Sequence, residues 1–166
     1  DNVLPFWLKN SQDHEYGGYF TCLDREGKVF DTDKFIWLQG REVWMFSMLY
    51  NKVEKRQEWL DCAIQGGEFL KKCGHDGNYN WYFSLDRSGR PLVEPYNIFS
   101  YTFATMAFGQ LSLATGSQEY ADIAKKTFDI ILSKVDNPKG KWNKLHPGTR
   151  NLKNFALPMI LCNLAL

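Results

Sequence analysis

One stretch of the chain, residues 35–49, holds the side chains best suited to chemistry. At helical spacing Trp37, Arg41, Trp44 and Met48 fall on one face, because residues three and four apart are neighbours on a helix. This stripe is apolar and aromatic except for the guanidinium in its middle. A charge on a face suited to burial is costly without a partner, and Arg offers a rigid fork of donors. Arg41 therefore either pairs with a buried carboxylate or points into a cavity and binds a polar ligand.

The elements that position this stripe come from an internal repeat. Residues 19–28 read YFTCLDREGK and residues 82–90 read YFSLDRSGR, so Leu-Asp-Arg begins at Leu23 and again, 62 residues later, at Leu85. A repeat of this length is a supersecondary unit. Each unit begins with a hairpin, because the Gly at the last turn position fits a type I turn or a bulge between strands. The strands are predicted over residues 17–23, 28–30, 81–85 and 90–93.

Two helices of different character follow each hairpin. The first is apolar nearly all round, whereas the second carries Lys and Glu on one face. We therefore expect the first helix of each pair to be inner and the second to be outer. Pro95 suits a first helical turn, Gly116 suits a helix end, and the pair Gly66-Gly67 indicates close contact between helices. The four helices are predicted over about 34–51, 57–73, 95–114 and 118–134.

The repeat continues at both ends of the chain. A third unit begins with an apolar helix over residues 152–166, and an earlier helix is represented by residues 3–9. Such units bury their faces only against neighbours, so the open face of the last helix needs a cover. The sequence predicts one domain over residues 1–166, truncated at both ends. In it, helical hairpins stack side by side with the inner helices around a common axis.

The bulk composition excludes several classes of protein. The net charge of +1 leaves no electrostatic footprint for nucleic acid. No run approaches the roughly 20 apolar residues of a membrane span, and no signal peptide is recognised. The four cysteines have no zinc-like spacing, so we expect free thiols in a reducing cytoplasm and no metal site. Aromatic residues reach 16%, which indicates either a large aromatic core or an aromatic-lined cleft.

Three blocks of sequence point to a family. They are HEYGGYFTCLDREGKVFDTDKFIWLQGREVWMFSMLY, PYNIFSYTFATMAFGQLSLATG and DNPKGKWNKLHPGTR followed by ALPMILCNLAL. In order and spacing they resemble the N-terminal half of the N-acylglucosamine 2-epimerase family, over essentially the whole chain. The resemblance implies an all-α fold, part of an (α/α)6 barrel with short β-hairpins between helix pairs. It also implies an isomerase that interconverts N-acetylglucosamine and N-acetylmannosamine by removing the C2 proton and returning it to the other face.

The resemblance also assigns roles to individual residues. The inner-helix arginine of the family matches Arg41, which would donate hydrogen bonds to a sugar oxygen near C1, where negative charge develops. Phe99 holds the place of Trp37 in the second unit, so both are expected to line the sugar pocket or else to pack in the core. Asn163 is polar within the apolar third helix and needs a partner if it is buried. We expect it to contact either the sugar or a neighbouring helix.

The two proton-transfer groups are not found on these helices. The chemistry needs acid–base groups on both faces of C2, and the family uses two histidines of its C-terminal half, which this sequence does not contain. His14, His75 and His146 all stand outside the predicted inner helices. Glu42 is the acidic candidate on an inner helix, and Arg41 beside it is expected to keep its carboxylate ionised. We therefore expect the chain alone to be inactive.

A basic loop spans residues 136–150. It lacks the GxxxxGK[ST] order of a P-loop, but glycines and lysines together can hold a phosphate. Several epimerases of the family are activated by ATP without consuming it. We therefore expect Lys139, Lys141, Lys144 and Arg150 to bind ATP as an allosteric activator, with a plain solvated loop as the alternative. No cofactor is expected in the chemistry itself.

The favoured interpretation is half of a cytoplasmic sugar 2-epimerase. A related aldose–ketose isomerase is the first alternative, and a non-catalytic protein-interaction module is the second. The expected partners are an amino-sugar substrate, the missing C-terminal half of the barrel and a second copy in a homodimer. Neither nucleic acid nor a membrane is expected among them.

Overall fold

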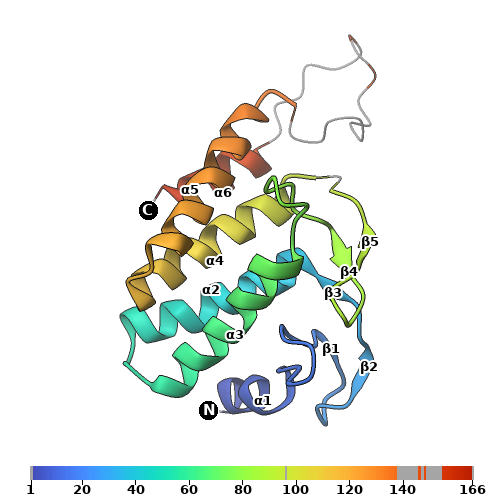
Figure 1. The fold of residues 1–166 in the computed structure, drawn as a ribbon, viewed down its shortest axis with the longest axis vertical. Coiled ribbons are helices and arrows are strands. Elements are labelled where there is room, and N and C mark those ends of the chain that lie inside the picture. The colour runs from blue at the N-terminus through green and yellow to red at the C-terminus, as the bar shows by residue number, and fades with distance from the viewer. Residues whose placement is uncertain (1, 96, 138–145, 147, 149–154, 166) are drawn as a thin grey trace.

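Helical hairpins dominate the computed structural model, which describes residues 2–95, 97–137, 146, 148 and 155–165 (Figure 1). Among these residues no helix has the length and apolar character needed to cross a membrane. The elements follow in the order α1 (Val3–Asn10), β1 (Cys22–Leu23), β2 (Val29–Asp31), β3 (Lys34–Phe35), α2 (Ile36–Lys52), α3 (Gln57–Cys73), β4 (Ser84–Leu85), β5 (Pro91–Val93), α4 (Phe99–Thr115), α5 (Gln118–Ser133) and α6 (Ala156–Leu164).

The predicted inner and outer helices are confirmed. The helices α2 and α4 pack side by side, α3 covers α2, and α5 covers α4 (Figure 1). Phe46 of α2 and Phe108 and Leu111 of α4 are fully buried in the core between these helices and their outer partners. The outer helices are amphipathic and turn only one face toward this core. Short β-hairpins precede both pairs, as the all-α barrel prediction required.

Two predicted helix starts are wrong. The inner helix α2 begins at Ile36 rather than near residue 34, because Lys34 and Phe35 form the strand β3. The helix α4 begins at Phe99 rather than Pro95, with Ile98 as its N-cap residue; just before it, Asn97 Oδ1 accepts a hydrogen bond from the Phe99 N–H at 2.9 Å. The predicted end of α4 is confirmed, since Gly116 adopts the left-handed conformation with φ 73°.

The two Leu-Asp-Arg motifs form equivalent hairpins. In each turn the Gly N–H donates to the Asp carbonyl, at 3.1 Å for Gly27 and Asp24 and at 3.0 Å for Gly89 and Asp86. Both glycines have positive φ, and the ladder shifts register beside each turn, as a bulged turn requires. The strand β3 pairs with β4, so the first unit is joined to the second hairpin.

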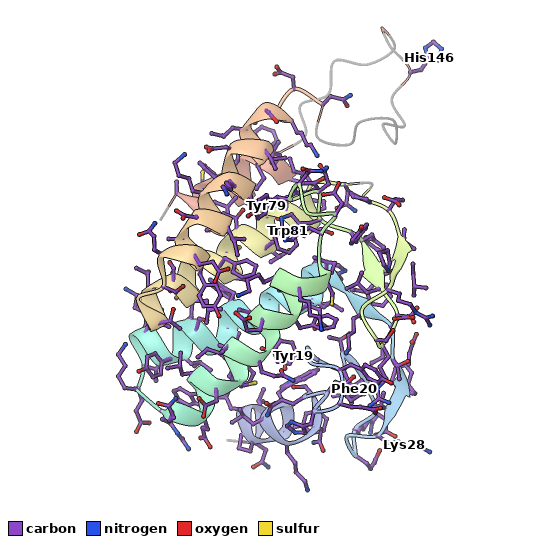
Figure 2. The ribbon with its side chains drawn as sticks, viewed as in Figure 1. Tyr19, Phe20, Lys28, Tyr79, Trp81 and His146 are labelled. Atoms are coloured by element: carbon purple, nitrogen blue, oxygen red, sulfur yellow. The ribbon has the colours of Figure 1, made fainter. Side chains whose placement is uncertain are left out.

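One buried aromatic residue per unit fixes each hairpin under its outer helix. Tyr19 and Trp81, 62 residues apart, are both fully buried (Figure 2). The Tyr19 hydroxyl donates to the Cys62 carbonyl of α3 at 2.7 Å, and the Trp81 Nε1–H donates to the Thr127 hydroxyl of α5 at 3.1 Å. Both repeat units therefore share a hydrogen bond from a buried aromatic residue to the outer helix, although the aromatic residue is Tyr in one unit and Trp in the other.

The glycine pair of α3 allows the close approach that the sequence predicted. A Cβ on Gly67 would lie 2.4 Å from Leu111 of α4, which confirms close contact between helices at this position. A Cβ on Gly66 would lie 2.2 Å from the Tyr19 hydroxyl oxygen. Gly66 thus accommodates the buried tyrosine of the N-terminal loop and not a second helix.

A buried ion cluster, formed by Asp13, Lys34 and Arg87, joins both units. The Lys34 ammonium is fully buried and donates to Asp13 Oδ2 at 2.9 Å and to the carbonyl oxygens of Gly17 and Arg87. Arg87 Nε donates to Asp13 Oδ2 at 3.0 Å. These cations hold the pKa of Asp13 at about 2, although burial acts to raise it. The cluster was not predicted from the sequence.

Candidate functional site

The stripe of α2 lies on the open side of the inner helices. Trp37, Trp44 and Met48 are only partly buried, and Arg41 is exposed. The fully buried face of α2, with Val43 and Phe46, packs instead on the other helices. The stripe therefore faces away from the core that this chain builds for itself.

Arg41 is held by aromatic rings and not by a carboxylate. Its guanidinium carbon lies 5.8 Å from the ring centroid of Trp37 and 5.5 Å from that of Phe103 on α4. The two ring centroids are 6.2 Å apart. Arg41 has no ion pair with any residue that the structure describes. Its hydrogen-bond donors are therefore available to a polar ligand, while the rings support the charge.

The aromatic partner on α4 differs from the one that the repeat suggested. Phe99 is partly buried at the start of α4, and the ring beside Trp37 and Arg41 belongs to Phe103, one helical turn later. The sequence did carry a signal for Phe103, because residues four apart share a helix face. That signal was missed because the alignment of the two units matched Trp37 with Phe99.

A cavity of about 240 Å3 lies next to Arg41, where α1 and the N-terminal loop approach α2. Its wall is mainly apolar and aromatic, with one cation and one carboxyl group, a composition common to small-molecule sites. The lining residues are Trp7, Thr21, Leu38, Arg41, Glu42, Trp44 and Met45.

Glu42 corrects one expectation. Only 8% of this residue is exposed, and burial raises the pKa of its carboxyl group to about 8. The expectation that Arg41 keeps Glu42 ionised is therefore wrong. The physical reason is direction: Arg41 extends to the open face between two rings, whereas Glu42 turns inward toward Ser11, whose Oγ lies 2.5 Å from Glu42 Oε1.

Asn163 lies apart from Arg41. It is exposed near the end of α6 and lines a second cavity of about 240 Å3, together with Trp44 of α2 and Gln110 of α4. The condition of burial is not met for Asn163, because this residue is exposed on α6, which packs on α4. Trp44 is the residue shared by the two cavities.

None of the three histidines lines the cavity beside Arg41. His14 is exposed, and His75 stacks on Tyr79 and meets Trp81 edge-on, where burial lowers its pKa. His146 stands outside the described helices. The basic-loop residues Lys139, Lys141, Lys144 and Arg150 lie outside the described residues. Within the described ranges no three His, Cys, Asp or Glu side chains gather as a metal site would need.

Comparison with known proteins settles the family. The model of the family described as N-acylglucosamine 2-epimerase (GlcNAc 2-epimerase) matches residues 18–166. This chain belongs to that family. A curated relative, the N-acylglucosamine 2-epimerase of Bos taurus, is 42% identical over 99% of the chain. The chain spans about 40% of the length of that relative.

Solved structures of sugar epimerases and isomerases share the architecture. A cellobiose 2-epimerase from Spirochaeta thermophila matches with a TM-score of 0.72 and 25% identity, over 80% of this chain and 33% of that one. A D-mannose isomerase matches with a TM-score of 0.78 over 97% of this chain and 42% of its own; at 19% identity it shows the fold alone. The helical hairpins described above are thus part of an (α/α)6 barrel, and α2 and α4 are two of its inner helices.

Proposed function

We propose that the protein containing this chain interconverts N-acetylglucosamine and N-acetylmannosamine by proton transfer at C2. The observation that carries this proposal is the 42% identity to the bovine N-acylglucosamine 2-epimerase along almost the whole chain. Relatives named cellobiose 2-epimerase are less similar, for example 28% identical for the protein from Dictyoglomus turgidum. An amino sugar is therefore favoured over a disaccharide or a simple hexose.

In this proposal Arg41 binds the reacting end of the sugar. Its guanidinium is exposed, has no ion pair among the described residues and is flanked by Trp37 and Phe103. Removal of the C2 proton places negative charge on the oxygen at C1. A planar fork of donors stabilises that charge more as it develops than in the ground state, and this difference is what lowers the barrier. The two rings offer apolar surface on which a sugar ring can stack.

The acid–base pair is proposed to come from the rest of the protein. Epimerisation needs one group on each face of C2. The inner helices α2, α4 and α6 carry no histidine along their described residues, and the acidic residue of α2, Glu42, is buried and turned toward Ser11. This chain then contributes one wall of the barrel and the oxyanion donor. The 166-residue chain alone is expected to lack activity.

Regulation and assembly are extensions of the same proposal. We expect ATP to act as an allosteric activator through Lys139, Lys141, Lys144 and Arg150, and to take no part in the chemistry. A cytoplasmic homodimer is proposed on the family resemblance.

The test follows deuterium at C2. The protein at its natural length is incubated with N-acetylmannosamine in D2O, with and without ATP, and proton NMR follows the C2 signal. Exchange at C2 together with formation of N-acetylglucosamine is expected. Cellobiose and mannose are matched alternative substrates. Turnover of either one with no exchange in the amino sugar would replace this proposal by the corresponding epimerase or isomerase.

A further inference from the structure

Glu42, which the epimerisation proposal does not use, makes an unusual contact. Its Oε1 lies 2.5 Å from Ser11 Oγ, and Ser11 Oγ in turn lies 2.7 Å from the carbonyl oxygen of Trp7. A serine hydroxyl has a single proton to donate. If Glu42 were ionised, both neighbours of Ser11 Oγ, the Glu42 carboxylate and the Trp7 carbonyl, could only accept hydrogen bonds. One of the two short contacts would then join two oxygens with no proton between them.

A proton on Glu42 satisfies both contacts. In this arrangement the carboxylic acid donates to Ser11 Oγ across the short 2.5 Å contact, and the Ser11 hydroxyl donates to the Trp7 carbonyl at 2.7 Å, the usual O–H···O distance. We propose that Glu42 is held as a neutral carboxylic acid whose O–H group donates a hydrogen bond to Ser11. This bond holds α1, which lines the cavity beside Arg41, against α2. Glu42 is a positioning residue in this assignment and does not transfer a proton to substrate.

The groups around Glu42 favour the neutral form. From the N-terminal loop Tyr19 faces it, and from α3 Cys62 faces it; both are buried and keep their protons, with pKa values raised by burial. On its own helix Arg41 is adjacent but makes no ion pair with it. No cation therefore offsets the cost of burying a carboxylate, and burial raises the pKa of Glu42 to about 8.

The contact matters because it lies where α1 meets the inner helix. Ser11 ends α1, and Trp7 of α1 lines the same cavity as Arg41 and Glu42. The hydrogen bond from Glu42 to Ser11 therefore holds α1 against α2 at the edge of this cavity. A neutral Glu42 also leaves the Arg41 guanidinium without a competing carboxylate. The benefit to sugar binding rests on the proposed function, whereas the protonation and the docking of α1 do not.

The protonation is tested directly by infrared difference spectroscopy. The spectrum of Glu42→Gln is subtracted from that of the wild-type protein at its natural length, at pH 6.5 and pH 9.5. At the lower pH the difference is expected to contain the carbonyl band of a protonated carboxylic acid, and at the higher pH the carboxylate bands. Carboxylate bands already present at pH 6.5 would overturn the proposal.

The direction of the hydrogen bond is tested through Ser11. If Glu42 donates to Ser11, the bond stabilises the neutral acid, so Ser11→Ala lowers the midpoint of the Glu42 titration by about one pH unit. If Ser11 donates to Glu42, the midpoint rises instead, which would refute the assignment. Ser47→Ala is the matched control, because Ser47 is buried on the same helix and its hydroxyl has no partner within the described part of the chain. It should leave the midpoint unchanged.

The positioning role has its own measurement, which needs no substrate. Hydrogen exchange of the α1 amides, corrected for the intrinsic effect of pH, is expected to accelerate in Ser11→Ala but not in Ser47→Ala. In the wild type it should also accelerate between pH 7 and pH 9.5, as Glu42 loses its proton. Unchanged protection of α1 in both comparisons would remove the positioning role. Because neither readout involves a sugar, a failure here is distinct from a failure of the epimerisation proposal.

Discussion

Replacing Asp13 by Asn tests the buried ion cluster that joins the two repeat units. The Asp13 side chain is fully buried and accepts hydrogen bonds from Lys34 Nζ at 2.9 Å and from Arg87 Nε at 3.0 Å. It also accepts hydrogen bonds from the backbone N–H groups of Glu15 and Tyr16. With Asn at this position, the Lys34 ammonium stays buried with neutral oxygens in place of its carboxylate partner: the carbonyl oxygens of Gly17 and Arg87 and the new amide oxygen.

The size of the effect follows from two independent considerations. The folded pKa of Asp13 is about 2 against 3.8 in the unfolded chain, a difference that corresponds to about 2.5 kcal/mol at pH 7. Removing one partner of a buried pair costs about 3–5 kcal/mol, because the other charge remains buried. We therefore expect Asp13→Asn to lower the free energy of unfolding by about 3 kcal/mol. This loss is large for a domain whose total stability is about 5–15 kcal/mol.

The measurement is urea denaturation at pH 7, followed by tryptophan fluorescence, on the protein at its natural length. Because the folded pKa of Asp13 lies below the unfolded one, its contribution is complete above pH 3.8 and declines as the pH falls toward 2. The difference between wild type and Asp13→Asn should therefore shrink at pH 3. Asp129→Asn is the control, since its ion pair with Lys125 is exposed and should contribute nothing measurable.

A double substitution provides the sharper test. In an Asp13→Asn background, Lys34→Met removes the unpaired buried charge and should restore part of the lost stability, although the carbonyl oxygens of Gly17 and Arg87 then lose a donor. The reasoning is refuted if Asp13→Asn stays within about 1 kcal/mol of the wild type. Strict additivity of the two substitutions would refute it as well, because interacting partners must couple.

Three further predictions concern Gly66, the partly buried His75 and Arg41. Gly66→Ala should lower the free energy of unfolding by about 1–3 kcal/mol in urea denaturation, because the added Cβ would lie 2.2 Å from the Tyr19 hydroxyl. Gly109→Ala is the control and should not destabilise the protein, because no atom lies within 4 Å of the added Cβ. Burial lowers the pKa of His75 below 6.5, so stability should fall as the pH drops below about 6.5, and His75→Phe should abolish that component. Arg41→Lys should lose most of kcat in the C2 exchange assay with little change in melting temperature, since an ammonium lacks the planar fork; near-normal turnover would refute the role.

The sequence determined the helical framework of this chain. Its helices differ in the number of faces that are apolar, and that difference alone separates inner from outer helices, because a helix buried on all sides must be apolar all round. The repeated Leu-Asp-Arg turn located both hairpins, since the left-handed conformations of Gly27 and Gly89 are readily adopted by glycine. Local rules suffice for such features, because the residues that decide them are close in sequence.

The tertiary structure decided the partners of each side chain. The stripe predicted that Arg41 and Trp37 share a face, but the second ring could be assigned to Phe103 only once α2 and α4 were packed. The charge state of Glu42 was predicted wrongly from its neighbour in sequence, because burial by α1 and α3 outweighs a guanidinium that points elsewhere. The ion cluster of Asp13, Lys34 and Arg87 spans 74 residues and has no periodic signal. Pairings between distant residues depend on how the units dock, and only the folded chain brings those groups within reach.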